Sequence, residues 1–207
     1  MLVVAGYLLG TFPTAILVGR REGRDPTREG SGNPGASNAF RTMGRRAGAL
    51  VLLGDLCKGA LAAGLGLATG NRAIAVACGL AAVVGHVLPV TRRLRGGKGV
   101  ATAAGMALVL VPLPAVAMAA VWVVAAKVSR TASLASIAIA VGLPVAVALD
   151  GRPVGEVAAF AACGALVVVR HRSNIDRLRR GAERPLQAYE PDSAAGPDAT
   201  ARYPRRP

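Results

Sequence analysis

The sequence has few aromatic residues, few acidic residues and almost no histidine. Phe, Trp and Tyr make up 3% of the 207 residues, there are two histidines, and 11 Asp and Glu stand against 25 Lys and Arg. The three cysteines lie singly in apolar stretches, without a C-x-x-C pair or a nearby cluster of ligand residues. This spacing indicates neither a disulfide framework nor a zinc site, and we expect no metal and no cofactor.

Ala, Val and Leu are abundant and occur in long uncharged runs. Hydrophobic residues make up 53% of the chain, and the mean hydropathy is +0.45. These values nearly exclude a water-soluble domain of this size. Backbone groups in lipid must be satisfied within each segment, and the runs lack the alternation of barrel strands. The composition therefore predicts an all-α integral membrane protein.

The apolar runs and the positions of the basic residues together predict a topology. The fourth and fifth runs, separated by Pro112, form either one kinked span or two short helices of roughly 18 to 21 Å. Two helices place the Arg-rich end and nearly all other basic residues on the inner side, as the positive-inside rule requires. We therefore predict about seven short transmembrane helices, with the N-terminus outside and the C-terminus cytoplasmic. The runs are about 2–18, 48–69, 73–90, 100–111, 113–126, 132–149 and 154–169.

The same topology divides the chain into a membrane domain and a tail. Residues 1–180 are expected to form the polytopic domain, with a long inner loop over residues 19–47. Residues 181–207 contain Pro, Ala and charged residues without an apolar period, which predicts a disordered cytoplasmic tail. The net charge of +14 is explained by membrane orientation, so we expect no nucleic-acid partner.

The first polar motif is G-S-G-N-P-G-A-S-N at residues 30–38, followed by an arginine. Its glycines allow backbone N–H groups to approach an anion closely, and its Ser and Asn side chains add donors. The motif is typical of phosphate binding, although a series of tight turns at a membrane surface is the alternative. The candidate substrate-binding residues are Ser31, Gly32, Asn33, Asn38 and Arg41.

The second motif is R-R-L-R-G-G-K-G-V at residues 92–100. It is not a Walker A loop, because Gly99 rather than Ser or Thr follows Lys98, and an apolar run rather than a strand precedes it. A glycine-rich turn that opens a helix directs free N–H groups and a positive dipole end at an anion. Gly97, Lys98 and Gly99 are therefore candidates for substrate binding. A positive-inside anchor would explain the arginines but not the glycines.

Two further motifs lie near the inner ends of the last two runs. Ser136, in T-A-S-L-A-S, is a candidate substrate ligand, with a bond to the preceding helical turn as the alternative. In R-H-R-S-N-I-D-R, His171 and Asn174 are spaced to share a helical face, which suits a proton acceptor beside an orienting amide. Asp176 completes the H-x-x-x-x-D spacing of acyl-CoA-dependent acyltransferases. Positions five apart lie about 140° around a helix, which argues against that motif.

Three ionisable residues lie within apolar runs. Asp55 and Lys58, three positions apart in the second run, predict either a structural salt bridge or a polar cavity. His86, near the inner end of the third run, either lines the site or caps that helix.

Taken together, G-S-G-N-P-G-A-S-N, G-D-L-C-K-G, G-H-V-L-P, R-G-G-K-G-V-A-T, S-L-A-S and R-H-R-S-N-I resemble the bacterial PlsY family over about residues 5–184. The resemblance implies transfer of a fatty acyl group from acyl-phosphate to the 1-hydroxyl of sn-glycerol 3-phosphate. The products are lysophosphatidic acid and phosphate, in the first acylation step of phospholipid synthesis. It also implies seven membrane helices, a cytoplasmic active site in the bacterial plasma membrane, and a functional link to the soluble enzyme that makes acyl-phosphate. Ser37 departs from the Thr that is usual in the family, and Asp176 departs from its basic residue.

The resemblance also implies which residues form the site: Ser31, Arg41, Lys98, Ser136, His171 and Asn174. Arg41 and Lys98 would clamp the phosphates, and either His171 or a substrate phosphate oxygen would accept the hydroxyl proton. Two alternatives from other classes remain. One is a small multi-pass transporter for an anionic phosphorylated solute, with broken helices near Pro112 and Pro114. The other is a structural membrane subunit that holds anionic lipid.

Overall fold

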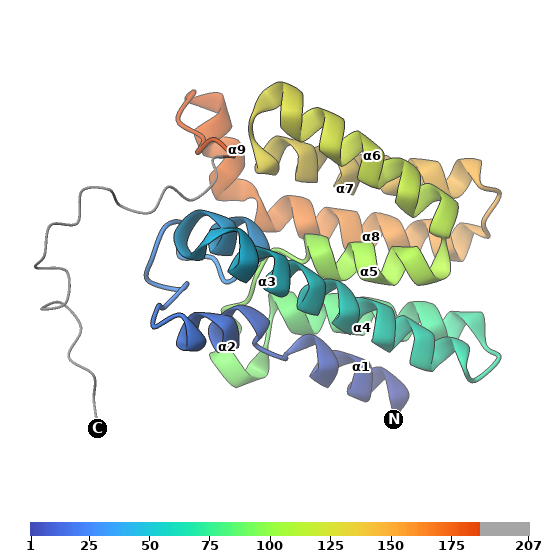
Figure 1. The fold of residues 1–207 in the computed structure, drawn as a ribbon. Coiled ribbons are helices and arrows are strands. Elements are labelled where there is room, and N and C mark those ends of the chain that lie inside the picture. The colour runs from blue at the N-terminus through green and yellow to red at the C-terminus, as the bar shows by residue number, and fades with distance from the viewer. Residues whose placement is uncertain (187–207) are drawn as a thin grey trace, which may run out of the picture.

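The computed structural model describes residues 1–186, which contain helices and no strand. Figure 1 shows most of these helices packed side by side in a bundle. The predicted all-α membrane class is confirmed. The elements are α1 (Leu2–Gly10), α2 (Thr14–Arg21), α3 (Ala36–Leu67), α4 (Arg72–Val87), the 3₁₀ helix η1 (Val90–Arg92), α5 (Val100–Leu110), α6 (Pro112–Ser129), α7 (Ala132–Leu149), α8 (Val154–Arg170) and α9 (Arg172–Arg179).

The first predicted span is broken, and the first predicted loop is shorter than expected. The break between α1 and α2 ends at Pro13, which has no N–H to donate and whose ring blocks a continuous helix. The loop predicted over residues 19–47 is reduced to residues 22–35, because α2 continues to Arg21 and α3 already begins at Ala36. An apolar run ends at the edge of the bilayer, but a helix continues beyond that edge into water. The apolar runs therefore did not predict where these helices end. Gly44, with φ 86°, then bends α3 near the start of its apolar part.

The two-helix interpretation of residues 100–126 agrees with the structure. Val111 has non-helical backbone angles of φ −142° and ψ 66°, and Pro112 starts α6. Figure 1 shows α6 running back from that point. Five helical segments, counting α1 with α2 and α4 with η1, are long and apolar enough to cross a membrane, or six if α8 and α9 form one span bent by 58°. The number of spans and their orientation stay predictions.

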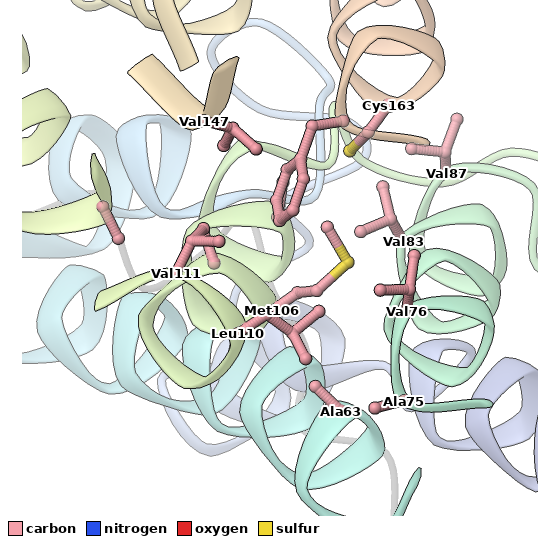
Figure 2. Packing of buried hydrophobic residues seen from close by; sticks show 14 residues of the cluster. Ala63, Ala75, Val76, Val83, Val87, Met106, Leu110, Val111, Val147 and Cys163 are labelled. Atoms are coloured by element: carbon pink, nitrogen blue, oxygen red, sulfur yellow. The ribbon is translucent and has the colours of Figure 1, made fainter. Parts of the chain in front are cut away.

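Close helix packing through small residues fixes the position of α5. A Cβ atom on Gly59 would overlap the carbonyl of Thr102, and one on Gly105 would overlap the carbonyl of Leu56, so the backbones of α3 and α5 meet directly. Figure 2 shows the apolar side chains that fill the space around α5, among them Met106. This packing sets the start of α5, where the second glycine-rich motif lies.

All four polar motifs lie at one end of the bundle. The loop before α3, the loop between η1 and α5, the turn between α6 and α7, and the α8–α9 junction share that end in Figure 1. The turns that join α3 to α4, α5 to α6 and α7 to α8 lie at the opposite end. The fold therefore gathers motifs that are far apart in the sequence.

Candidate active site

A cavity of about 790 Å³ opens at the end of the bundle where the motifs gather. Its walls come from the α2–α3 loop, the η1–α5 loop and the α8–α9 region, and they include Ser31, Gly32 and Asn33. Within the described part of the chain, no Asp or Glu lines it. Such a surface attracts anions strongly. Its eight basic lining residues are Arg28, Arg92, Arg95, Lys98, Arg170, Arg172, Arg177 and Arg184.

Lys98 and Asn174, predicted independently from two motifs, are joined by a hydrogen bond. The Nζ atom of Lys98 donates to Oδ1 of Asn174 at 2.6 Å. Nδ2 of Asn174 in turn donates to Oε1 of Glu183 at 2.7 Å, and Nε of Arg177 donates to Oε2 of Glu183 at 2.9 Å. Both the oxygen and the NH₂ group of the Asn174 amide are thus hydrogen-bonded, and the oxygen accepts from the ammonium of Lys98.

Burial and neighbouring charges set the ionisation of Lys98. Burial of the ammonium is the main cause that lowers its pKa to about 8, and Arg177, Arg41 and Arg170 lower it further, whereas Glu183 raises it. Lys98 is therefore charged at neutral pH and loses its charge in the mildly alkaline range. A bound phosphate dianion would favour the charged form and raise this pKa.

His171 lies at the junction of α8 and α9 and is 2% exposed. Its Nδ1 atom is 2.8 Å from the carbonyl oxygen of Val167. Because a carbonyl only accepts, Nδ1 carries the hydrogen, and Nε2 of the neutral ring is left as an acceptor. The prediction that His171 and Asn174 share one helical face stays a prediction. After the 58° bend His171 is the N-cap residue of α9, and the backbone N–H of Asn174 donates to its carbonyl at 2.8 Å.

Arg41, on the first turns of α3, is half-buried. It lies close enough to Lys98, Arg177 and Glu183 to interact with each of them electrostatically. The predicted pair of phosphate clamps, Arg41 and Lys98, is therefore brought to one region.

Comparisons with known proteins identify the family. The family model described as glycerol-3-phosphate acyltransferase matches residues 1–181. The chain belongs to this family. It is similar to the glycerol-3-phosphate acyltransferase of Rubrobacter xylanophilus, with 46% identity over 185 residues that cover 89% of this chain and 93% of the relative. It is also similar to that of Myxococcus xanthus, with 46% identity over 186 residues that cover 88% and 97%.

Two crystal structures of PlsY, an integral membrane glycerol 3-phosphate acyltransferase, have the same fold as this acyltransferase. The TM-score is 0.85 for the glycerol 3-phosphate form and 0.83 for the lysophosphatidic acid form. Both are 36% identical, with 89% of this chain and 93% of the other covered. The predicted PlsY resemblance, the acyltransferase class and the membrane embedding are confirmed, and they replace the transporter and structural-subunit alternatives.

In this acyltransferase, Asn38 orders the loop that precedes α3 instead of lining the cavity. Its Oδ1 atom accepts from the backbone N–H of Ser31 at 2.8 Å, and Nδ2 donates to the carbonyls of Pro26 at 3.0 Å and Glu29 at 3.1 Å. Asn38 is 2% exposed, so its amide is used within the protein. The structure thus holds Ser31 at the cavity through Asn38, and it does not support the prediction that Asn38 binds substrate.

The N–H group of Gly97 is also committed within the protein, contrary to the prediction of a free donor. It donates to the carbonyl of His86 at 3.1 Å, and the N–H of Gly96 donates to the carbonyl of Val87 at 3.2 Å. The guanidinium of Arg170 donates to the carbonyls of both glycines at 3.1 and 3.3 Å. Gly99, with φ 88°, is the residue directly before α5. The loop is therefore held by hydrogen bonds within the protein, and Leu94, Arg95, Gly96 and Lys98 are its residues that line the cavity.

Ser136 and Asp176 lie outside the cavity lining of the acyltransferase. The Ser136 hydroxyl donates to the carbonyl of Ala132 at 2.7 Å and accepts from Nε1 of Trp122 at 3.1 Å, so it joins α6 to α7. The helical back-bond given as the alternative is thus present. Arg41, His171 and Asn174 are likewise not among the lining residues, so the place of Ser136 in the site stays a prediction. Asp176 is exposed and does not pair with His171, as the helical angle predicted.

Glu183 contacts two residues of the candidate site, Asn174 and Arg177, and was not predicted from the sequence. It belongs to the stretch 181–207 that was predicted to be a disordered tail; residues 187–207 of that stretch lie outside the described residues. The Glu183 side chain is 8% exposed and connects Asn174 to Arg177. Its charge could have indicated a role, because Glu183 is an acidic residue flanked by several arginines at the Arg-rich end of the last apolar run.

Proposed function

We propose that this acyltransferase moves a fatty acyl group from acyl-phosphate to the 1-hydroxyl of sn-glycerol 3-phosphate. The products are lysophosphatidic acid and inorganic phosphate, and the site faces the cytoplasm at the bacterial plasma membrane. The observation that carries the proposal is the cavity of about 790 Å³ with eight basic lining residues and, among the described residues, no carboxylate on its wall. Two phosphate groups, one on each substrate, match that charge.

The reaction needs positioning and charge stabilisation more than it needs a strong nucleophile. An acyl-phosphate is a mixed anhydride, so phosphate is a good leaving group. The oxygen of the 1-hydroxyl forms a bond to the acyl carbon, and the bond from that carbon to the phosphate oxygen breaks. Lys98 and Arg41 would hold the phosphates and offset the charge that develops on the carbonyl oxygen.

The hydroxyl proton needs an acceptor, and Nε2 of His171 would be that acceptor. His171 itself does not line the cavity, but its neighbours Arg170 and Arg172 do. The neutral ring with its hydrogen on Nδ1 has the required free lone pair. Ser31, which lines the cavity, would orient glycerol 3-phosphate beside it, and Asn174 would act through its hydrogen bond to Lys98. No acyl-enzyme is proposed, because the alcohol attacks the donor directly.

A second, smaller cavity supports a donor that carries an acyl chain. It has a volume of about 360 Å³ and is lined by Leu8, Phe12, Pro13 and Ile16 of the α1–α2 region. Arg92 lines both this cavity and the basic one, so it lies between an apolar and an anion-binding space. A single-chain lipid with an anionic head fits such a junction. A membrane-borne donor of this kind also accords with a link to a soluble enzyme that makes acyl-phosphate.

The test compares two acyl donors with detergent-purified protein and glycerol 3-phosphate. Palmitoyl-phosphate and palmitoyl-CoA are supplied separately, and lysophosphatidic acid and released phosphate are measured. We expect equal amounts of both products with palmitoyl-phosphate and none with palmitoyl-CoA. Turnover with the CoA ester alone would contradict the proposed donor. An acylated protein trapped in a single turnover would contradict direct transfer.

A further inference from the structure

His86 lies against the η1–α5 loop, which carries Lys98, although His86 itself does not line the basic cavity. The backbone N–H of Gly97 donates to the carbonyl of His86 at 3.1 Å. A Cβ atom built on Gly97 would overlap Nε2 of the His86 ring, so the ring packs directly against the α-carbon of this glycine. The imidazole therefore forms the surface on which the loop rests, one residue before Lys98.

The other edge of the His86 ring faces a buried ion pair. Nδ1 of His86 is 3.7 Å from Oδ1 of Asp55, and the same oxygen is 2.9 Å from Nζ of Lys58. All three residues are at most 5% exposed, and Lys58 also donates to the carbonyl of Phe12 at 3.4 Å. Separating this pair would leave an uncompensated charge in an apolar interior, which is strongly unfavourable. At 3.7 Å the pair makes no hydrogen bond to Nδ1, which has no partner among the described residues, so the pair holds the ring by packing against it.

We propose that His86, seated on the Asp55–Lys58 pair, is a positioning residue that fixes Gly97 and thereby places the ammonium of Lys98 in the active site. The position of Gly97 matters because Nζ of Lys98, the next residue, must lie 2.6 Å from Oδ1 of Asn174, which is 76 positions away in the sequence. The inference rests on the proposed function, in which Lys98 holds a substrate phosphate. It assigns a role in that site to the two apolar-run motifs G-D-L-C-K-G and G-H-V-L-P.

The first variant adds one methyl group between the ring and the loop. Gly97 does not have a positive φ, so Gly97→Ala tests space and not backbone strain. The added Cβ forces the loop away from His86, and we expect kcat/KM for glycerol 3-phosphate to fall about 100-fold, as for a misplacement near 1 Å. Gly64→Ala is the matched control, because a Cβ there meets nothing within 4 Å, and it should keep wild-type kinetics.

The second variant removes the obstacle. In Gly97→Ala combined with His86→Ala, the added methyl group no longer meets the ring and fills part of the space that the ring leaves, so kcat/KM should rise above that of either single variant. Such non-additivity is expected only for residues in direct contact. A double variant no more active than Gly97→Ala, or a Gly97→Ala enzyme with wild-type kinetics, would overturn the proposal.

The pH profile separates displacement of Lys98 from a general loss of structure. If Gly97→Ala moves the loop toward solvent, Lys98 becomes less buried, and the alkaline limb of kcat/KM should shift from about pH 8 toward the ordinary lysine value of 10.5. A smaller fraction of folded enzyme would lower the whole profile without shifting that limb. An unshifted limb in Gly97→Ala would therefore contradict the proposal.

A third variant covers the case in which the alanine variants do not fold. His86→Phe keeps a flat ring against Gly97 but removes both nitrogens, and we expect near wild-type kcat/KM. A large loss in folded His86→Phe would show that the nitrogens matter rather than the contact. Wild-type turnover is measured first: no turnover with either donor contradicts the proposed function, whereas an active wild type with unaffected variants contradicts this inference alone.

Discussion

Lys98 combines a positive charge with a hydrogen bond to Asn174, and both depend on the ammonium group. We expect Lys98→Ala to lower kcat by about 10² to 10³-fold, as for other removed charge-stabilising donors. Lys98→Arg should also fail, because a planar guanidinium does not reproduce the single contact of 2.6 Å to Asn174. Steady-state kinetics in detergent measure both. Wild-type activity in Lys98→Ala would exclude Lys98 from the reaction, and wild-type activity in Lys98→Arg would contradict the need for the single ammonium contact to Asn174.

The ionisation of Lys98 predicts the alkaline side of the pH profile. Since its pKa is about 8, kcat/KM should fall as pH rises through that value and the ammonium loses its proton. Glu183 raises this pKa, so Glu183→Gln should move the alkaline limb to lower pH. The profile of kcat/KM is recorded for both proteins from neutral to alkaline pH. A limb that moves to higher pH in Glu183→Gln would contradict the assignment.

His171 is expected to accept the hydroxyl proton. Removing a general base lowers rates by about 10² to 10⁴-fold, and we expect His171→Ala to lie in this range with a nearly unchanged KM. The kinetic constants for glycerol 3-phosphate, together with a thermal unfolding curve, test this. A loss below about tenfold in folded protein would assign the proton to a substrate phosphate oxygen instead.

At the scale of helices, the contact between α3 and α5 depends on the absence of side chains at two glycines. A methyl group on Gly105 would overlap the carbonyl of Leu56, so Gly105→Ala must push the two helices apart. We expect a loss of about 1 to 3 kcal/mol of stability and a lower Tm in detergent. Gly64→Ala on the open side of α3 is the control and should not lower the Tm. Equal Tm values would show that the helices tolerate the separation.

The helix boundaries also show where sequence reasoning stops. Hydropathy located the apolar part of every span, yet it placed Arg41 in a loop, whereas Arg41 lies on α3. In a polar stretch at a membrane surface, the backbone N–H and C=O groups find hydrogen-bond partners equally well in a helix and in a loop. The composition of the stretch therefore does not decide between the two. Asn38, on the first turn of α3, shows what does: its amide bonds tie the preceding loop to the helix start.

The whole molecule has a basic end and an opposite end, which we predict to face the cytoplasm and the outside, respectively. The test starts from a protein with its three cysteines replaced by alanine and adds one cysteine, by Arg95→Cys or Arg152→Cys. A membrane-impermeant maleimide should label Arg152→Cys in intact cells and Arg95→Cys only after permeabilisation. Arg95 lines the cavity, so the reverse pattern would contradict a cytoplasmic active site.

Sequence alone was enough to predict the class of the protein, the gathering of the polar motifs at one end of the bundle, and Lys98, His171 and Asn174 as candidate site residues. These follow from local properties: apolar length, the placement of arginine, and glycine next to polar groups. The three-dimensional structure was needed to show that Asn38 and Ser136 bond within the protein, that Glu183 accepts from Asn174, and that the His86 ring packs against Gly97. The physical reason is that a side chain's role depends on which partner lies within about 3 Å. Those partners, such as Lys98 and Asn174 at 76 positions apart, are brought together by helix packing and not by the neighbouring sequence.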